Sequence, residues 1–557
     1  MVSDLPEARD SGDLPTATRH QSLRILPMGD RALLLEVDSL DAAIVLRTRL
    51  EASRPVGVID LVPAARTVLV RVDPAALPLA AARAWVTGMT ADAASAPAAV
   101  LGVVELEVAY DGADLADTAA LLGLSANELV RRHTAVEWTV AFTGFAPGFG
   151  YLVSPDWTFD VPRLPSPRTR VPRGSVGLAG EFTGAYPRDT PGGWRLIGTT
   201  PAPLFDPDAA SPALLAPGTR VRFRVTDAET APVPRDSGDA PQSRRPVAVS
   251  ASGPSRAPAL RIVEPGLLAT VQDLGRSGFA SLGVARSGSL DRGSARTANR
   301  LVGNPEGAAV IESTMGGFRA VALHDLWFAV TGAWGPVMLA GHELDPYEAH
   351  AWPAGTELHL DWFAHGARAY LAVRGGIDAP LALGSRSTDT LAGLGPARLA
   401  AGDELAVGAA PDAPIPVAAV APWGAPHDEE LEVALAPGAR ADWFAASAHR
   451  SLFEQVWTVT NEADRVGMRL DGPVLDRART GVRGGDGAPA IRTELPSEGM
   501  VPGALQVPPS GRPTILLADG PVTGGYPVIA VATDAALDLL AQARPGTHVR
   551  FRHARPA

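Results

Sequence analysis

Four arginines stand close together in the segment "VPRLPSPRTRVPRGSVG": Arg163, Arg168, Arg170 and Arg173. The chain as a whole is acidic, with a formal net charge of -12. Each guanidinium group can bind two oxygens of a carboxylate or phosphate, and the prolines stiffen the loop that carries it. The cluster predicts an anion site in which Arg168 and Arg173 have catalytic roles. The alternative is a solvated loop whose arginines pair with nearby Asp and Glu.

The segment "TGFAPGFGYL", residues 143–152, precedes this loop and follows the strand-like run "EWTVAF". Glycine lets a ligand approach the backbone closely, and aromatic side chains can wall an apolar cleft. We expect the segment to lie beside the arginine loop as part of the same site. The alternative is that the aromatic residues belong to the core and the glycines only turn the chain. The candidate binding residues are Gly144, Pro147, Gly148, Phe149 and Tyr151.

His133 ends a predicted helix that begins at a capping box, Ser125 to Glu128. Imidazole can exchange a proton near neutral pH, so His133 is a candidate acid or base. The alternative is a side chain that only complements the dipole at the end of the helix.

Three further candidates lie in loops of the second half. Arg276 in "VQDLGRSGF" and Arg386 in "LALGSRSTDTL" are candidate binding residues, and Asp519 in "LLADGPVTGGYP" is a candidate catalytic residue. The alternative for Asp519 is a turn former at the end of a strand. A helix is expected to begin near Asp291, with Gly303 as its C-terminal cap.

Two parts of the chain end alike. "PGTRVRFR" at 217–224 matches "PGTHVRFR" at 545–552, "PGGW" matches "TGGYP", and "RGSVGLAG" matches "PGALQVP", all in the same order. Matched features in the same order predict a duplicated β module, each with a double-glycine loop beside a cleft. The segments "PAGTELHL" and "AAGDELAVG" share a turn-then-strand form and indicate a further β module in the second half. The candidate binding residues in these loops are Gly174, Ser175, Tyr186, Gly192, Gly193, Gly524, Gly525 and Tyr526.

The elements that position these residues predict a mainly β protein with some α+β structure. Residues 1–21 form a polar, disordered tail, and residues 22–100 a small α/β domain with a strand pair broken at Gly29-Asp30 and a helix in "SLDAAIVLRTRLEAS". A β module spans 101–226, and a Pro- and Ser-rich linker spans 227–258. A first β domain of the second half spans 259–425, and the second copy of the β module spans 426–557.

Composition excludes several classes of function. The 557 residues include no lysine and no cysteine, which rules out a lysine Schiff base, a Walker A lysine, a biotinylated lysine in this chain and a cysteine nucleophile. The negative charge argues against nucleic acid and anionic membranes as partners. No spacing typical of a metal site is present, so no metal-ligating residue is predicted. The chain shows neither a secretory signal nor a long apolar run, so we expect a cytoplasmic protein.

A family resemblance covers the chain from about residue 22 to its end, apart from the linker. "FTGFAPGFGYL", "PRTRVPRGSVGLAG" and "TGAYPRDTPGGWRLIGTTPAPLFD" resemble allophanate hydrolase subunit 1, a family that contains the B subunit of 5-oxoprolinase and a sporulation histidine-kinase inhibitor. "ATVQDLGRSGF", "GVARSGSLDRGSARTANRLVGN" and "DRVGMRLDG" resemble the subunit 2 family, which contains the C subunit of 5-oxoprolinase. The whole resembles a fusion of the B and C subunits, and also the carboxyltransferase region of urea carboxylase.

This resemblance implies cyclophilin-like β-barrels and an ATP-dependent 5-oxoprolinase that opens the lactam ring of a small-molecule substrate. It further implies ATP with magnesium as cofactor and a separate A subunit as partner, and leaves a homo-oligomer open. Two alternatives are a carboxyltransferase that acts on urea or a related amide with a separate biotin carrier, and a regulatory binding module. The sequence departs from the family pattern at Phe182, Thr199, Pro521 and Val522.

Overall fold

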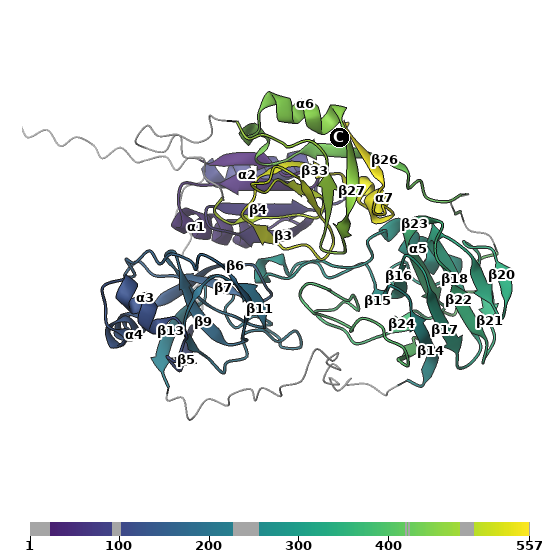
Figure 1. Ribbon diagram of the computed structural model, residues 1–557, viewed down its shortest axis with the longest axis horizontal. Coiled ribbons are helices and arrows are strands. Elements are labelled where there is room, and N and C mark those ends of the chain that lie inside the picture. The colour runs from purple at the N-terminus through teal and green to yellow at the C-terminus, as the bar shows by residue number, and fades with distance from the viewer. Residues whose placement is uncertain are drawn as a thin grey trace, which may run out of the picture.

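The structure, a computed structural model, describes residues 23–91, 102–226, 256–417, 420–421, 424–478 and 495–555 (Figure 1). The protein is mainly β, as predicted, and the strands and helices form four domains. The predicted tail lies outside the described residues, as does most of the predicted linker. Within the described residues, no helix combines the length and the apolar character needed to cross a membrane.

The N-terminal domain is a small α/β unit. Its antiparallel sheet has the order β1-β2-β4-β3 and consists of β1 (Arg24–Pro27), β2 (Ala32–Glu36), β3 (Val58–Pro63) and β4 (Thr67–Val72). The helices α1 (Leu40–Ala52) and α2 (Leu79–Ala91) pack on one face of this sheet. The predicted break at Gly29-Asp30 and the predicted first helix are both confirmed.

The first barrel follows. It begins with β5 (Val103–Val108), α3 (Leu115–Leu121), α4 (Ala126–Ala135), β6 (Trp138–Thr143) and β7 (Gly150–Val153). It continues with β8 (Arg168–Val171), β9 (Ser175–Ala179), β10 (Phe182–Ala185), β11 (Thr190–Gly192), β12 (Arg195–Thr199) and β13 (Arg220–Val225). The Ser125 hydroxyl accepts a hydrogen bond from the backbone N–H of Glu128, which confirms the predicted cap of α4.

The third domain is a sandwich of two antiparallel sheets. One sheet has the order β20-β19-β22-β17-β14-β25-β24 and the other the order β15-β16-β23-β18-β21. Apolar side chains from both sheets form one core, and α5 (Arg292–Leu301) lies against β18 and β23, with Asp291 as its N-cap. The predicted strands in "PAGTELHL" and "AAGDELAVG" are confirmed as β22 and β25 of the first sheet. The strands are β14 (Pro258–Pro265), β15 (Leu268–Gln272), β16 (Val310–Thr314), β17 (Phe318–Ala322), β18 (Leu326–Trp334), β19 (Val337–Leu339), β20 (His342–Leu344), β21 (His350–Trp352), β22 (Glu357–Leu360), β23 (His365–Val373), β24 (Ile377–Asp378) and β25 (Glu404–Val407).

The second barrel is closed, with the order β26-β33-β30-β31-β28-β27-β34. Its helices are α6 (Ala446–Glu454) and α7 (Asp534–Ala541). Its strands are β26 (Glu430–Pro437), β27 (Val456–Ala463), β28 (Gly467–Asp471), β30 (Ala504–Gln506), β31 (Thr514–Leu516), β33 (Val528–Ala532) and β34 (His548–His553), with β29 (Glu498–Gly499) and β32 (Thr523–Gly524) paired beside it.

The predicted duplication is confirmed strand by strand. The first barrel has the order β12-β9-β10-β7-β6-β13-β5, and a bridge between Ala109 and Thr199 brings its two ends together. This is the order of the second barrel, with β13 in the place of β34. Each of these two final strands runs parallel to the first strand of its barrel and antiparallel to the strand that follows the helix. Each double glycine lies in or beside a short strand of a two-stranded sheet, β11 paired with β8 or β32 paired with β29.

The N-terminal domain shares a core with the second barrel, at the opposite end of the sequence (Figure 1). Met28, Leu34 and Leu69 pack with Met500 and Val531 in one buried cluster. The backbone N–H of Gly29 donates to the carbonyl oxygen of Pro437 at 3.0 Å. Sequence patterns did not predict this contact.

Candidate functional site

The "TGFAPGFG" segment joins β6 to β7 and contacts the second half of the chain. The backbone N–H of Gly148 donates to the carbonyl oxygen of Leu282 at 2.9 Å, and the Thr143 hydroxyl donates to that of Ser281. These two acceptors belong to the short 3-10 helix η1 (Ala280–Leu282). Phe145 is 43% exposed and has a φ of 67°, an unusual value for a bulky residue, and such strain often occurs at functional sites.

Loops from the two halves approach so closely here that only glycine fits. A Cβ atom on Gly144 would overlap the Thr523 hydroxyl, next to the second double glycine. A Cβ atom on Gly283 would lie 2.6 Å from the carbonyl oxygen of Ala146. The structure therefore brings together glycine loops that the sequence analysis selected separately in each half.

The aromatic residues of the first barrel form a packed cluster. Phe149 and Tyr186 are each 1% exposed and contact one another, and Phe149 also contacts Trp194 and Tyr151. Burial raises the pKa of both tyrosines to about 12, so their hydroxyls stay protonated at neutral pH. The structure favours the core interpretation for these side chains, and Phe145 alone of the loop's aromatic residues is exposed.

The arginine loop lies beside this cluster, as predicted, since the charges of Arg163 and Arg168 act on the Tyr186 hydroxyl. Arg168 pairs with Asp114 at 2.7 Å, and Arg170 pairs with Asp189 at 2.8 Å. Pairing with acidic residues was the alternative interpretation, and it holds for these two arginines. The Arg173 side chain is exposed.

The small residues around this loop shape the backbone. A Cβ atom on Gly192 would lie 2.6 Å from the Tyr186 hydroxyl, whereas one on Gly193 would only touch Pro167. The backbone N–H of Gly174 donates to the carbonyl oxygen of Tyr186, and Ser175 is buried in β9. Pro147 lies in the turn before Gly148, which has a φ of 76°.

His133 lies in the core of the first barrel and is not an exposed acid or base. It is fully buried between Trp138 and Phe223, and its ring nitrogens contact the Tyr110 and Thr183 hydroxyls at 2.7 and 2.9 Å. In the duplicated barrel the same place is apolar: Trp138 donates to the carbonyl oxygen of His133, as Trp457 does to that of Leu452. This favours a structural role for His133 and not the proton-transfer role.

Replacing His133 by leucine is expected to make the free energy of unfolding fall less between pH 7.5 and pH 5. Burial lowers the pKa of His133 to about 3 from its usual 6.5. As the pH falls from 6.5 towards 3, the unfolded chain gains a proton that the folded protein does not, so folding becomes weaker over that window. At pH 5 this proton uptake lowers the free energy of unfolding of the wild type by about 2 kcal/mol. Urea denaturation of both proteins at pH 7.5 and pH 5 measures it, and an unchanged difference between them at the two pH values would contradict the prediction.

Asp519 ties the second barrel to the sandwich. Its carboxylate pairs with the Arg465 guanidinium at 3.0 Å and accepts hydrogen bonds from the Ser287 hydroxyl at 2.7 Å and from the backbone and hydroxyl of Thr390. Arg465 also pairs with Glu312 at 2.5 Å, and all three charged groups are buried. Burial alone would raise the pKa of Asp519, but the charge of Arg465 and the hydrogen bonds hold it below its usual value. These contacts engage both carboxylate oxygens, so Asp519 positions loops and does not face a ligand.

The remaining predicted residues lie in different parts of the second half. Arg276 is buried, donates to the carbonyl oxygens of Ala382 and Ser387, and lines a pocket. Arg386 pairs with Asp378 at 2.7 Å, outside that pocket. In the second barrel Gly524 packs against Gln506 and Gly525 faces the carbonyl oxygen of Leu495. Tyr526 lines a separate groove with Gln506 and Arg512.

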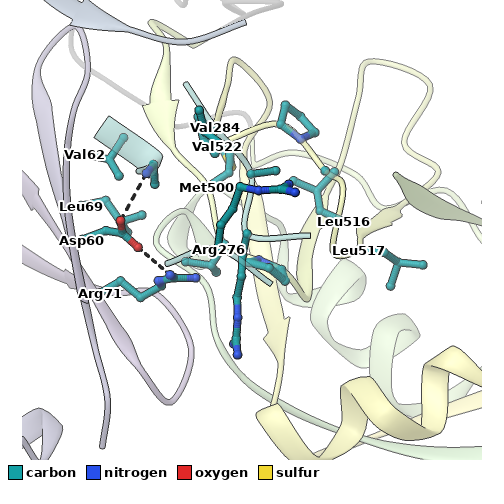
Figure 2. Close-up of a pocket in the computed structure, with 17 residues that line it drawn as sticks. Asp60, Val62, Leu69, Arg71, Arg276, Val284, Met500, Leu516, Leu517 and Val522 are labelled. Atoms are coloured by element: carbon teal, nitrogen blue, oxygen red, sulfur yellow. Dashed lines mark hydrogen bonds and ion pairs between the residues drawn. The ribbon is translucent and has the colours of Figure 1, made fainter. Parts of the chain in front are cut away.

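Three domains build the pocket that Arg276 lines, which we call the junction pocket (Figure 2). Its cavity volume is about 30 Å³. Asp60 and Arg71 come from strands β3 and β4, Arg276 from the loop after β15, and Met500 and Val522 from the second barrel. Asp60 pairs with Arg71 at 2.5 Å and accepts from the backbone N–H of Ala280 at 3.2 Å. This hydrogen bond holds η1 against the N-terminal domain. The first barrel also binds η1, so all four domains meet here.

A second pocket, which we call the arginine pocket, adjoins the junction pocket and shares Arg71 and Arg286 with it. Sequence patterns did not select Arg31, Arg71, Arg286 or Arg292, because the first two residues are far along the chain from the last two. The segment "GVARSGSLD" carries Arg286 and offered the one local signal, as a motif of the family resemblance. Among the described residues, no group of three or more His, Asp and Glu side chains is placed to hold a metal ion.

Comparison with known proteins matches both halves. The family model "Carboxyltransferase domain, subdomain C and D" matches residues 23–215, and "Carboxyltransferase domain, subdomain A and B" matches residues 282–553. The crystal structure of the protein TTHA0988 is similar along nearly the whole chain, with a TM-score of 0.77, 37% identity, and coverage of 94% of this chain and 99% of that one.

Each of the following curated relatives matches only part of the chain. The chain is 34% identical to the C subunit of 5-oxoprolinase from Escherichia coli K12 over 52% of its own length and 90% of that protein. It is 51% identical to the B subunit of 5-oxoprolinase from Escherichia coli O157:H7 over 22% of its own length and 56% of that protein. It is also 32% identical to urea amidolyase of Saccharomyces cerevisiae over 53% of its own length, but this covers only 16% of that much longer protein.

Proposed function

Because the chain belongs to the carboxyltransferase-domain family and unites counterparts of the B and C subunits of 5-oxoprolinase, we propose that it is a fused component of an ATP-dependent 5-oxoprolinase. In this proposal it activates the lactam carbonyl of 5-oxoproline, and a separate A subunit completes ring opening to glutamate. The relatives are subunits of that enzyme by name, which supports a partner of this kind.

The observation that carries the proposal is the meeting of both halves at one place. The glycine loop of the first barrel is hydrogen-bonded to η1 of the second half and lies against Thr523 of the second barrel. A regulatory module would need only the first half, whereas this geometry requires both. It therefore favours an enzyme component whose site is composite.

Arg276 of the junction pocket suits a phosphate group of a nucleotide. Nη1 of Arg276 is buried and has no hydrogen-bond partner within the described part of the chain, so it can donate to a phosphate oxygen without losing an existing contact. Arg276 would hold a phosphate group, with the task that lysine performs in many other nucleotide sites. ATP would supply the phosphoryl group that makes the carbonyl carbon of the lactam susceptible to water. The chain's own contribution is to hold charge, to orient the lactam and to exclude water.

The test is a reaction that contains the purified chain, ATP, magnesium and 5-oxoproline, with and without an A subunit. We expect glutamate and ADP to form in equal amounts, and only when the A subunit is present. Parallel reactions with 2-pyrrolidone, which lacks the carboxylate, report on substrate selection. ATP hydrolysis that 5-oxoproline does not stimulate, in the presence of an active A subunit, would refute the proposal.

A carboxyltransferase is the second candidate, and the similarity to urea amidolyase favours it. Without lysine, the chain cannot carry biotin itself, so the carboxyl group would come from a biotinylated carrier on another polypeptide. Urea and a carboxylated carrier, supplied in place of ATP and 5-oxoproline, distinguish this candidate from the first.

A further inference from the structure

The arginine pocket lies where the N-terminal domain, the sandwich and the second barrel meet. Its cavity volume is about 60 Å³, enough for a few water molecules or one small polar group. Arg31 and Arg71 come from the N-terminal domain, Arg286 and Ser289 from the loop before α5, and Arg292 from the first turn of α5. The remaining wall is largely apolar and consists of Ile59, Leu290, Pro502, Leu517, Ala518 and Leu537.

Three of the four arginines have carboxylate partners. Arg71 pairs with Asp60 at 2.5 Å, and Arg292 pairs with Asp534 at 2.8 Å and with Asp538 at 3.3 Å. Arg31 pairs with Asp30 at 3.1 Å and also with Asp534. The Asp534 side chain is 52% exposed, so solvent screens much of its charge.

Arg286 has no such partner within the described part of the chain. Its Nε donates to the carbonyl oxygen of Leu274 at 3.2 Å. Burial lowers the pKa of Arg286 to about 10, and the positive charges of Arg71, Arg292 and Arg31 act in the same direction. A partly buried cation that is surrounded by other cations is costly unless an anion joins it.

Unused hydrogen-bond donors line the same pocket. Nη2 of Arg31, Nε of Arg71 and the hydroxyl of Ser289 are all buried without a hydrogen-bond partner among the residues that the structure describes. Buried polar groups are nearly always paired, so three unpaired donors around one cavity point to a missing acceptor. This observation rests on geometry and is independent of the charge of Arg286.

We infer that the arginine pocket binds the oxyanion group of a small molecule, with Arg286, Arg71 and Ser289 as donors and the molecule's apolar part against Ile59 and Leu537. The shared chemistry is that of a carboxylate or a phosphate, since both present several oxygens to guanidinium groups. The inference concerns binding alone and holds whichever reaction the chain catalyses.

The test is calorimetric titration of the full chain with L-5-oxoproline, 2-pyrrolidone and inorganic phosphate, for the wild type and for Arg286→Gln. We expect Arg286→Gln to weaken binding of the anion about tenfold to a hundredfold. Ser289→Ala should weaken it about threefold to tenfold. Binding of 5-oxoproline but not of 2-pyrrolidone identifies a carboxylate site, and binding of phosphate alone identifies a phosphate site.

Arg83→Gln is the matched control, because it makes the same change at an exposed position on α2. Thermal unfolding without ligand checks the fold, and Arg286→Gln should unfold at the wild-type temperature or above, since the variant relieves repulsion among the arginines. Wild-type chain that binds neither anion, or anion binding that is equal in the wild type and in both pocket variants, would overturn the inference. If the wild-type chain binds the anion but shows no lactam hydrolysis with an active A subunit, the result contradicts the proposed function and leaves the inference about this site standing.

Discussion

Replacing Asp519 by alanine is expected to lower the free energy of unfolding by about 3–5 kcal/mol, because it leaves Arg465 buried beside an empty place. Arg465 is 1% exposed, so water cannot replace the lost carboxylate. The Ser287 and Thr390 hydroxyls lose their acceptor at the same time. Chemical denaturation at neutral pH measures the change, and the pKa of Asp519 is low enough for it to be ionised there.

The matched control is the exposed pair of Arg552 and Glu432, which lie 2.5 Å apart on the second barrel. Glu432→Ala removes a carboxylate in the same way, but its side chain is 70% exposed, so the expected loss is below about 1 kcal/mol. Similar losses at the two sites would mean that the buried network does not hold the sandwich and the second barrel together.

Replacing Gly283 by alanine is expected to destabilise the contact between the first barrel and η1. It should also lower any activity of the composite site about a hundredfold, since misplacing reacting groups by about 1 Å can have an effect of that size. Gly283 has a φ of 80°, and its new Cβ atom would lie 2.6 Å from a backbone oxygen of the first barrel. The loop must therefore move, and the hydrogen bonds from Gly148 and Thr143 to η1 weaken with it. We expect a loss of roughly 3 kcal/mol of unfolding free energy, from backbone strain and the clash together.

Gly341→Ala separates these two causes. Gly341 has a φ of 84°, nearly that of Gly283, but a Cβ atom there meets nothing within 4 Å. It should lose only the cost of the left-handed conformation, about 1 kcal/mol. Denaturation of the two variants side by side gives the difference, and equal losses would show that the close approach at Gly283 has no energetic importance.

Local patterns predicted the elements of the fold well. The capping box at Ser125, the helix at Asp291 and the duplicated final strands depend on neighbouring residues, and the structure confirms each of them. His133 shows where such patterns stop. Its position at the end of a helix is visible in the sequence, but its burial against Trp138 and Phe223 depends on strands elsewhere in the barrel.

The candidate site could be predicted only in part. The glycine loops and the arginine loop were found because each is a dense local motif. The arginine pocket is different, because Arg71 and Arg286 are separated by more than one whole domain and are brought together where the N-terminal domain contacts η1. Asp519 was selected from its place after a strand, but its role depends on Arg465, for which the sequence offers no matching signal.

The core that the N-terminal domain shares with the second barrel has a consequence for synthesis on the ribosome. The face that carries Met28, Leu34 and Leu69 is made long before the residues that cover it, Met500 and Val531. About 400 residues separate the two, so at roughly 5–20 residues per second the face waits on the order of 20–80 s for its partner. During translation this apolar surface is therefore a long-lived target for chaperones and for aggregation with other nascent chains.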